Sequence, residues 1–311
     1  MKVAAVQAFG PLFDPAKGME KLQDLAVGAA ASGARLIVFP EAFLGGYPKG
    51  HHFGAPVGSR SDEGREWYRR YFDGAIAVPG PETARIAKLA QDIHSDIVVG
   101  VIERAAADEG GGTLYCTALC FSSQGVLLGK RRKLMPTAAE RLIWGFGDGS
   151  TLNVFEATAG RVGAVICWEN YMPALRLSQY AQGVQFYCAP TVDDRENWTS
   201  TMRTIALEGR CFVISANQFM RRSDAPADFN PVQGNDPATV LINGGSLIVS
   251  PLGKILAGPV FGQEAIVTAD IDLDDIKRGK MDFDVSGHYA RSDIFTLMIN
   301  DKKQRPVIKA T

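Results

Sequence analysis

The sequence predicts an α/β fold with mixed sheets, and two patterns in the first half of the chain support this. Short apolar runs at 2–8 and 36–39 flank a segment of helical periodicity, which is the order of a βαβ unit with parallel strands. The runs 113–121 and 126–131 flank the polar residues 122–125, which is typical of an antiparallel hairpin. Because both kinds of connection occur, we do not expect a purely parallel, doubly wound sheet.

The helix of the βαβ unit has start and stop signals. Asp14 is placed to cap the N-terminus, Pro15 suits the first helical position, and Gly33 suits the end. Apolar residues at helical spacing predict one buried face, formed by Met19, Leu22, Leu25, Ala26 and Ala29.

The same patterns predict the remaining elements. Helices are expected at 61–72, from Pro81 onward, and at 173–182, 197–210 and 272–280; strands are expected at 97–102, 184–189, 212–216, 238–249, 254–256 and 265–271. Residues 220–237 are predicted to form a long polar loop. With no repeat or linker in the sequence, we expect one domain at 1–280 and a C-terminal arm at 281–311 that takes part in contacts between subunits.

Composition argues against several kinds of partner. The 33 Lys and Arg residues balance 34 Asp and Glu residues, and this net charge of −1 favours neither nucleic acid nor an anionic membrane surface. No apolar run approaches the roughly 18 residues that span a bilayer, and the N-terminus lacks the apolar region of a signal peptide. The five cysteines have neither disulfide-framework nor zinc-site spacing. We therefore expect reduced thiols, no metal and a cytoplasmic location.

Three stretches each place one reactive side chain at the end of a buried strand. They are Glu41 after 36–39, Lys133 after the hairpin, and Cys167 after an apolar run. Taken singly, each has an ordinary interpretation: a solvated acid, a solvated basic patch and a buried core thiol. A sheet that presents its strand ends at one rim would bring the three together. They then supply a general base, a cation that stabilises negative charge, and a nucleophile.

The sequence leaves open how the thiol of Cys167 loses its proton. A free cysteine is mostly protonated at neutral pH. The ammonium of Lys133 would lower the pKa of Cys167 by about 1–3 units if it lay close by. Alternatively, Glu41 takes the proton during the attack.

Several side chains near these stretches are expected to contact the substrate. The loop 134–150 is rich in glycines and aromatics, which suits the lining of a pocket. The candidates for substrate contact are Tyr47, Phe53, Trp144, Trp168 and Phe186, together with the acid Glu169.

The chain resembles the nitrilase superfamily of carbon–nitrogen hydrolases over nearly its whole length. The matching stretches are 39–41, 132–137, 140–141, 144–150 and 167–173, followed by 189–191, 193–195, 206–210 and 287–289. Within the superfamily, amidase and carbamoylase branches usually have Asp two residues after the nucleophile. Glu169 at that position resembles the true nitrilases instead.

The resemblance implies a four-layer αββα sandwich without metal or cofactor. It also implies roles for four catalytic residues: Glu41 as general base, Lys133 as stabilising cation, Cys167 as nucleophile, and Glu140 as a second glutamate that positions the others. The expected substrate is a small-molecule nitrile, converted to the carboxylic acid and ammonia. The expected assembly is a homodimer or a larger homo-oligomer.

Four alternatives remain. A nitrile or cyanide hydratase would release the amide, and an aliphatic or carbamoyl amidase would start from an amide; Glu169 disfavours the amidase. A papain-like thiol hydrolase needs a histidine beside Cys167, and only His94 and His288 lie outside the His51–His52 loop. A non-catalytic assembly protein would have no need of all four reactive residues.

Overall fold

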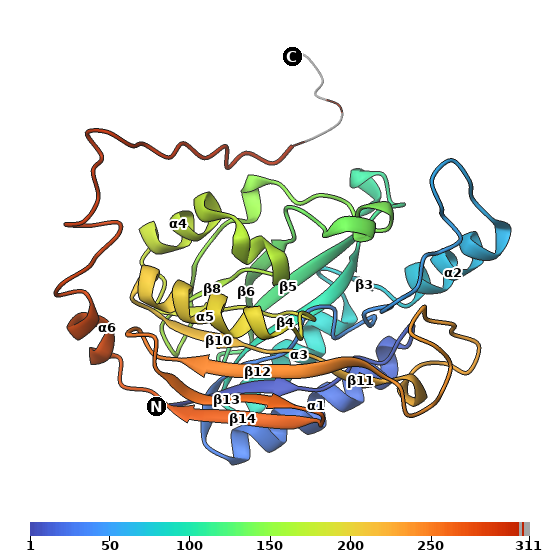
Figure 1. Cartoon of the computed structure of the whole chain (residues 1–311), viewed down its shortest axis with the longest axis horizontal. Coiled ribbons are helices and arrows are strands. Elements are labelled where there is room, and N and C mark those ends of the chain that lie inside the picture. The colour runs from blue at the N-terminus through green and yellow to red at the C-terminus, as the bar shows by residue number, and fades with distance from the viewer. Residues whose placement is uncertain (305–306, 308–311) are drawn as a thin grey trace.

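A computed structural model describes residues 1–304 and 307, and it consists of two mixed β-sheets with helices against them (Figure 1). The first sheet has the order β14–β1–β2–β4–β5–β6, with β3 paired to β4. Its strands are β1 (Lys2–Gln7), β2 (Ala34–Val38), β3 (Ile76–Ala77), β4 (Asp96–Arg104), β5 (Leu114–Ser122), β6 (Val126–Arg132) and β14 (Ala265–Asp270). The predicted βαβ unit and hairpin are both confirmed, since β1 and β2 pair in parallel and β5 and β6 pair antiparallel.

The second sheet has the order β11–β12–β10–β9–β8–β7, with β13 paired to β12. Its strands are β7 (Phe155–Glu156), β8 (Arg161–Ala164), β9 (Phe186–Cys188), β10 (Phe212–Ser215), β11 (Phe219–Arg221), β12 (Val240–Val249) and β13 (Ile255–Phe261). β13 is longer than the predicted strand 254–256 because it continues through Gly258 and Pro259, residues that usually interrupt a strand. β11 occupies the start of the predicted loop 220–237.

The α-helices lie close to their predicted positions. They are α1 (Pro15–Ala31), α2 (Asp62–Asp73), α3 (Pro81–Asp92), α4 (Pro173–Ala181), α5 (Glu196–Gly209) and the short α6 (Asp274–Gly279). The predicted cap of α1 is confirmed, because Asp14 Oδ1 accepts a hydrogen bond of 3.0 Å from the backbone N–H of Lys17. Five short 3₁₀ turns in the described residues were not predicted: η1 (Ala107–Glu109), η2 (Ala138–Leu142), η3 (Gly149–Thr151), η4 (Cys167–Tyr171) and η5 (Arg222–Asp224).

Three hydrophobic cores separate four layers. One core packs α1 and α3 against the first sheet, and another packs α4 and α5 against the second sheet. The third lies between the two sheets and includes Val38, Val98, Cys188 and Ile214. This is the αββα sandwich that the resemblance implied.

The chain after α6 runs along the outside of the molecule, as the red trace in Figure 1 shows. Its far part touches the body again near η3, where the N–H of Gln304 donates 2.8 Å to Asp148 Oδ2. Within residues 1–304 and 307, no helix is both long and apolar enough to cross a membrane.

Candidate active site

The end of β2 carries Glu41 into the interior, and β4 holds it there. The N–H of Phe43 donates 2.8 Å to the carbonyl of Gly100, so this segment stays attached to β4 beyond the end of β2. A Cβ atom at Gly100 would lie 2.6 Å from Glu41 Cα, so only glycine permits this approach. The side chain of Glu41 is fully buried.

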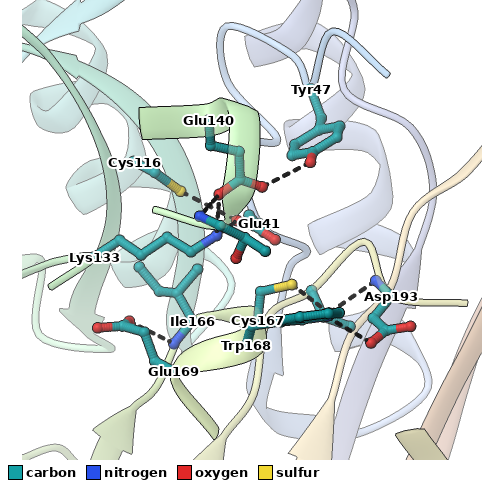
Figure 2. Close-up of polar contacts among 12 residues, drawn as sticks. Glu41, Tyr47, Cys116, Lys133, Glu140, Ile166, Cys167, Trp168, Glu169 and Asp193 are labelled. Atoms are coloured by element: carbon teal, nitrogen blue, oxygen red, sulfur yellow. Dashed lines mark hydrogen bonds and ion pairs between the residues drawn. The ribbon is translucent and has the colours of Figure 1, made fainter. Parts of the chain in front are cut away.

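Lys133 joins two carboxylates. It follows β6, and its backbone N–H donates 2.8 Å to the carbonyl of Cys116. Its Nζ donates 2.6 Å to Glu41 Oε1 and 2.8 Å to Glu140 Oε2 (Figure 2). The Glu41 and Lys133 side chains are both 0% exposed, so this ion pair is shielded from water.

Glu140 lies in the turn η2, and both of its oxygens are fixed. Oε2 also accepts 2.6 Å from the N–H of Thr137, the residue that caps the start of the turn. Oε1 accepts 2.7 Å from the Tyr47 hydroxyl (Figure 2). Glu140 therefore ties Lys133 to the loop after β2.

Cys167 begins the turn η4 with a left-handed backbone, at φ +50°. This conformation is unusual for a residue with a Cβ, and the surroundings hold it. The N–H of Cys167 donates 2.9 Å to Pro190 O, while Asn170 Nδ2 donates 2.7 Å to the Cys167 carbonyl. The Thr191 hydroxyl donates 3.2 Å to the sulfur. In Figure 2, Glu41 lies between Glu140 and Cys167.

The pKa shifts of these groups indicate how the Cys167 thiol loses its proton. Burial, followed by the charges of Glu41 and Glu140, raises the pKa of Cys167 despite the opposing effect of Lys133. Lys133 thus acts in the expected direction but is outweighed by burial and the two acids, which favours the alternative in which Glu41 takes the thiol proton during the attack. Burial also raises the pKa of Glu41, which makes the carboxylate a stronger base. Burial opposes the charge of Lys133, but the neighbouring acids raise its pKa well above the ordinary value, so it remains an ammonium.

Two adjoining cavities open beside these residues. One, of about 230 Å³, has Cys167 and Trp168 in its wall. The other, of about 430 Å³, is lined partly by Phe53 and Trp144. Tyr47, Lys49, Thr137 and Glu140 contribute to both walls. A small molecule that reached Cys167 would thus lie against the Tyr47–Glu140 pair.

Comparison with known proteins identifies the family of the chain. Residues 2–281 match the family described as carbon-nitrogen hydrolase. The chain belongs to this family. A nitrilase of Bradyrhizobium diazoefficiens is 56% identical to this hydrolase, covering 98% of its chain and 94% of the relative. An aliphatic nitrilase of Sinorhizobium fredii is 52% identical over 99% and 98% of the two chains. A bifunctional nitrilase/nitrile hydratase of Lupinus angustifolius is 51% identical over 99% and 88%.

A solved structure shows the same fold at much lower identity. The amidase NitN from a Nesterenkonia species is 18% identical, with a TM-score of 0.66, and the match covers 91% of this hydrolase and 97% of the amidase. The similarity supports the sandwich architecture and carries no information on the substrate.

Glu169 does not contact a substrate cavity, contrary to expectation. Its carboxylate is buried and accepts 2.9 Å from Arg131 Nη2, 2.6 Å from the N–H of Leu134 and 3.2 Å from the N–H of Ile166. Arg131 and Leu134 lie close to Lys133 in sequence, and Ile166 precedes Cys167. Glu169 therefore connects the segment that carries Lys133 to the turn that begins with Cys167.

Of the aromatic residues expected to contact the substrate, Trp168 lines a cavity and Phe186 does not. Trp168 is 42% exposed and lines the smaller cavity, where its Nε1–H donates 2.9 Å to Asp193. Phe186 is fully buried between the sheets, with its ring stacked on Phe212 at 6.1 Å, so it does not line the pocket. It faces the core because β9 directs alternate side chains there.

Three residues near the site were given no role from sequence. Thr191 bonds the sulfur, Asp193 bonds Trp168, and the Cys116 sulfur lies 3.5 Å from Glu41 Oε1. Thr191 and Asp193 belong to motifs of the resemblance, which was a usable signal. Cys116 sits in an apolar strand and carried no signal beyond core burial.

Proposed function

We propose that the protein is a nitrilase, which hydrolyses an organic nitrile to the carboxylic acid and ammonia. The observation that carries this proposal is the buried ammonium of Lys133, held between Glu41 and Glu140 beside the thiol of Cys167. The full-length similarity to proteins named nitrilase supports the choice of a nitrile.

In the proposed first step, the sulfur of Cys167 attacks the nitrile carbon. Glu41 takes the thiol proton as the S–C bond forms, and one π-electron pair of the C≡N bond moves to nitrogen. Lys133 stabilises the charge that develops there, and the proton passes from Glu41 to nitrogen. The product is a thioimidate.

Two waters complete the reaction. Glu41 deprotonates the first water, which adds to the thioimidate carbon. The tetrahedral intermediate then expels ammonia and leaves a thioester. The second water, activated in the same way, releases the carboxylic acid and restores the thiol. In sum, one nitrile and two waters give one acid and one ammonia.

A hydratase activity is the second candidate. If the tetrahedral intermediate expels the thiol instead of ammonia, one nitrile and one water give the amide. Relatives from Lupinus angustifolius and Nicotiana tabacum, at 50–51% identity, are named bifunctional nitrilase/nitrile hydratase, which favours testing both products.

The test is a panel of aliphatic, aryl and arylacetonitriles with ammonia and amide measured separately. We expect ammonia and acid from at least one nitrile and none from Cys167→Ala. Cys188→Ala and Cys211→Ala, which alter buried thiols elsewhere, should keep most of the activity. Glu41→Gln should lower turnover by at least about 100-fold, as expected for a lost general base. Equal losses in all three cysteine variants would contradict the nucleophile assignment.

Location and assembly are also proposals. All five cysteines are free thiols, which supports a cytoplasmic location. The arm at 281–311 exposes apolar side chains such as Phe295 and Met298, at 78% and 88%. Exposed apolar side chains of this kind support a homodimer or a larger homo-oligomer, in which a second copy would cover them.

A further inference from the structure

A second buried thiol reaches the same carboxylate as the proposed nucleophile. Cys116, in β5, is 1% exposed, and its sulfur lies 3.5 Å from Glu41 Oε1, a distance suited to an S–H···O hydrogen bond (Figure 2). The backbone carbonyl of Cys116 accepts the N–H of Lys133 at 2.8 Å. Cys116 thus contacts the carboxylate of Glu41 through its side chain and the backbone N–H of Lys133 through its carbonyl.

The two oxygens of Glu41 have different surroundings. Oε1 accepts from Lys133 and faces the Cys116 thiol, which burial keeps protonated by raising its pKa well above the ordinary value. Oε2 is buried and has no hydrogen-bond partner among residues 1–304 and 307. The donors on Oε1 fix the plane of the carboxylate and leave Oε2 available to a proton.

We propose that Cys116 is a positioning residue for the general base, donating its S–H to Glu41 Oε1 so that Oε2 stays free to take protons. This inference rests on the proposed role of Glu41 in nitrile hydrolysis.

The weakness of a thiol donor is the chemical reason for cysteine at this position. An S–H group donates only weakly, so it orients the carboxylate with little loss of basicity. A serine hydroxyl would bond the charged carboxylate more strongly and lower the pKa of Glu41. An alanine would remove the donor and raise the pKa of Glu41.

The other groups that face Glu41 are unchanged when only residue 116 is replaced. They are Lys133 after β6, Glu140 on η2, Cys167 on η4, Tyr47 on the loop after β2, and Tyr71 on α2. Differences between variants at position 116 therefore report on this one donor.

The experiment compares Cys116→Ser and Cys116→Ala with Cys120→Ser and Cys120→Ala. Cys120 is a matched control because it lies on the same strand, is equally buried and faces the same core between the sheets. The measurement is kcat/KM for nitrile hydrolysis against pH. We expect the acidic limb to move to lower pH in Cys116→Ser and to higher pH in Cys116→Ala, by about half a unit each. In both Cys120 variants, the acidic limb of the kcat/KM profile should lie at the same pH as in the wild type.

Shifts of the same sign in both Cys116 variants, or limbs that coincide with wild type, would overturn the proposal. Infrared spectroscopy keeps it testable if these variants fail to fold. In a Cys167→Ala background, the S–H stretching band of Cys116 should rise in frequency when Glu41 is replaced by Gln, and an unmoved band rejects the contact. A wild-type enzyme that hydrolyses no nitrile would instead reject the proposed function, while the infrared result still decides the contact.

Discussion

The Tyr47 hydroxyl donates a 2.7 Å hydrogen bond to Glu140 Oε1, whose other oxygen accepts from Lys133. Through this chain of contacts, the loop after β2 controls the position of the cation. Tyr47 and Glu140 also line both cavities. A substrate that fills either cavity therefore presses on the pair that positions Lys133.

Replacing Tyr47 with phenylalanine removes this hydrogen bond and keeps the ring. A hydrogen bond to a charged group contributes about 1.5–3 kcal/mol, so we expect kcat/KM to fall by about 10-fold or more. Steady-state kinetics on a small nitrile measure this. Tyr68→Phe is the control, because its hydroxyl bonds the exposed Gly112 carbonyl away from the site. Equal kinetics in both variants would argue against the positioning role of Tyr47.

Gly100→Ala should affect catalysis through the backbone. The new Cβ would lie 2.3 Å from Pro40 O and 2.6 Å from Glu41 Cα, so the base must shift. Overpacking of this kind costs about 1–3 kcal/mol, and a displacement of about 1 Å can cost 100-fold in rate. Turnover and chemical denaturation measure the two effects. Gly112→Ala, whose Cβ meets its nearest atom at 3.9 Å, should change neither.

Glu169→Gln tests the reassignment of this acid. It leaves Arg131 buried without its anionic partner, and breaking such a pair costs about 3–5 kcal/mol in the free energy of unfolding. We expect a clear loss in thermal and urea unfolding, with KM changing by the same factor for small and large nitriles. The exposed Glu156→Gln should leave stability unchanged. A KM effect confined to one nitrile class would restore the substrate-contact hypothesis.

The pH dependence of stability should include a contribution from Glu109. Burial opposes its charge, but hydrogen bonds from Arg132 and Lys303 lower its pKa to about 2, below the ordinary value of 4.5. A carboxyl group with a depressed pKa stabilises the fold above its unfolded-state pKa, and the effect is lost as the pH falls from about 4.5 toward 2. Glu109→Gln should therefore melt below wild type at pH 6, and the difference should shrink on acidification. A constant difference from pH 6 to pH 3 would contradict this.

Much of the architecture was predictable because local signals agreed with the global fold. Asp14 and Pro15 mark the start of α1, and the hairpin around 122–125 follows from its polar turn. The meeting of Glu41 and Lys133 followed from their position at strand ends. The αββα layering, in contrast, came from the resemblance, because periodicity does not say which sheet packs on which.

The features that the sequence did not predict depend on where side chains point and how deeply they are buried. The spacing of Thr137 and Glu140 is that of a capping box, a signal for the turn η2 that was not used. Nothing in the sequence says that Glu169 turns toward Arg131 rather than into the pocket. The sequence also left open whether Lys133 or burial dominates the pKa of Cys167, because that balance depends on the depth of the thiol and on its distances to the charged groups.

The left-handed backbone of Cys167 has a consequence for engineering. Such a conformation costs most L-residues about 1–2 kcal/mol, and glycine relieves that cost. Directed evolution that screens only for heat tolerance would therefore reward glycine at position 167 and enrich inactive clones. A thermostability campaign on this scaffold needs a turnover screen in every round.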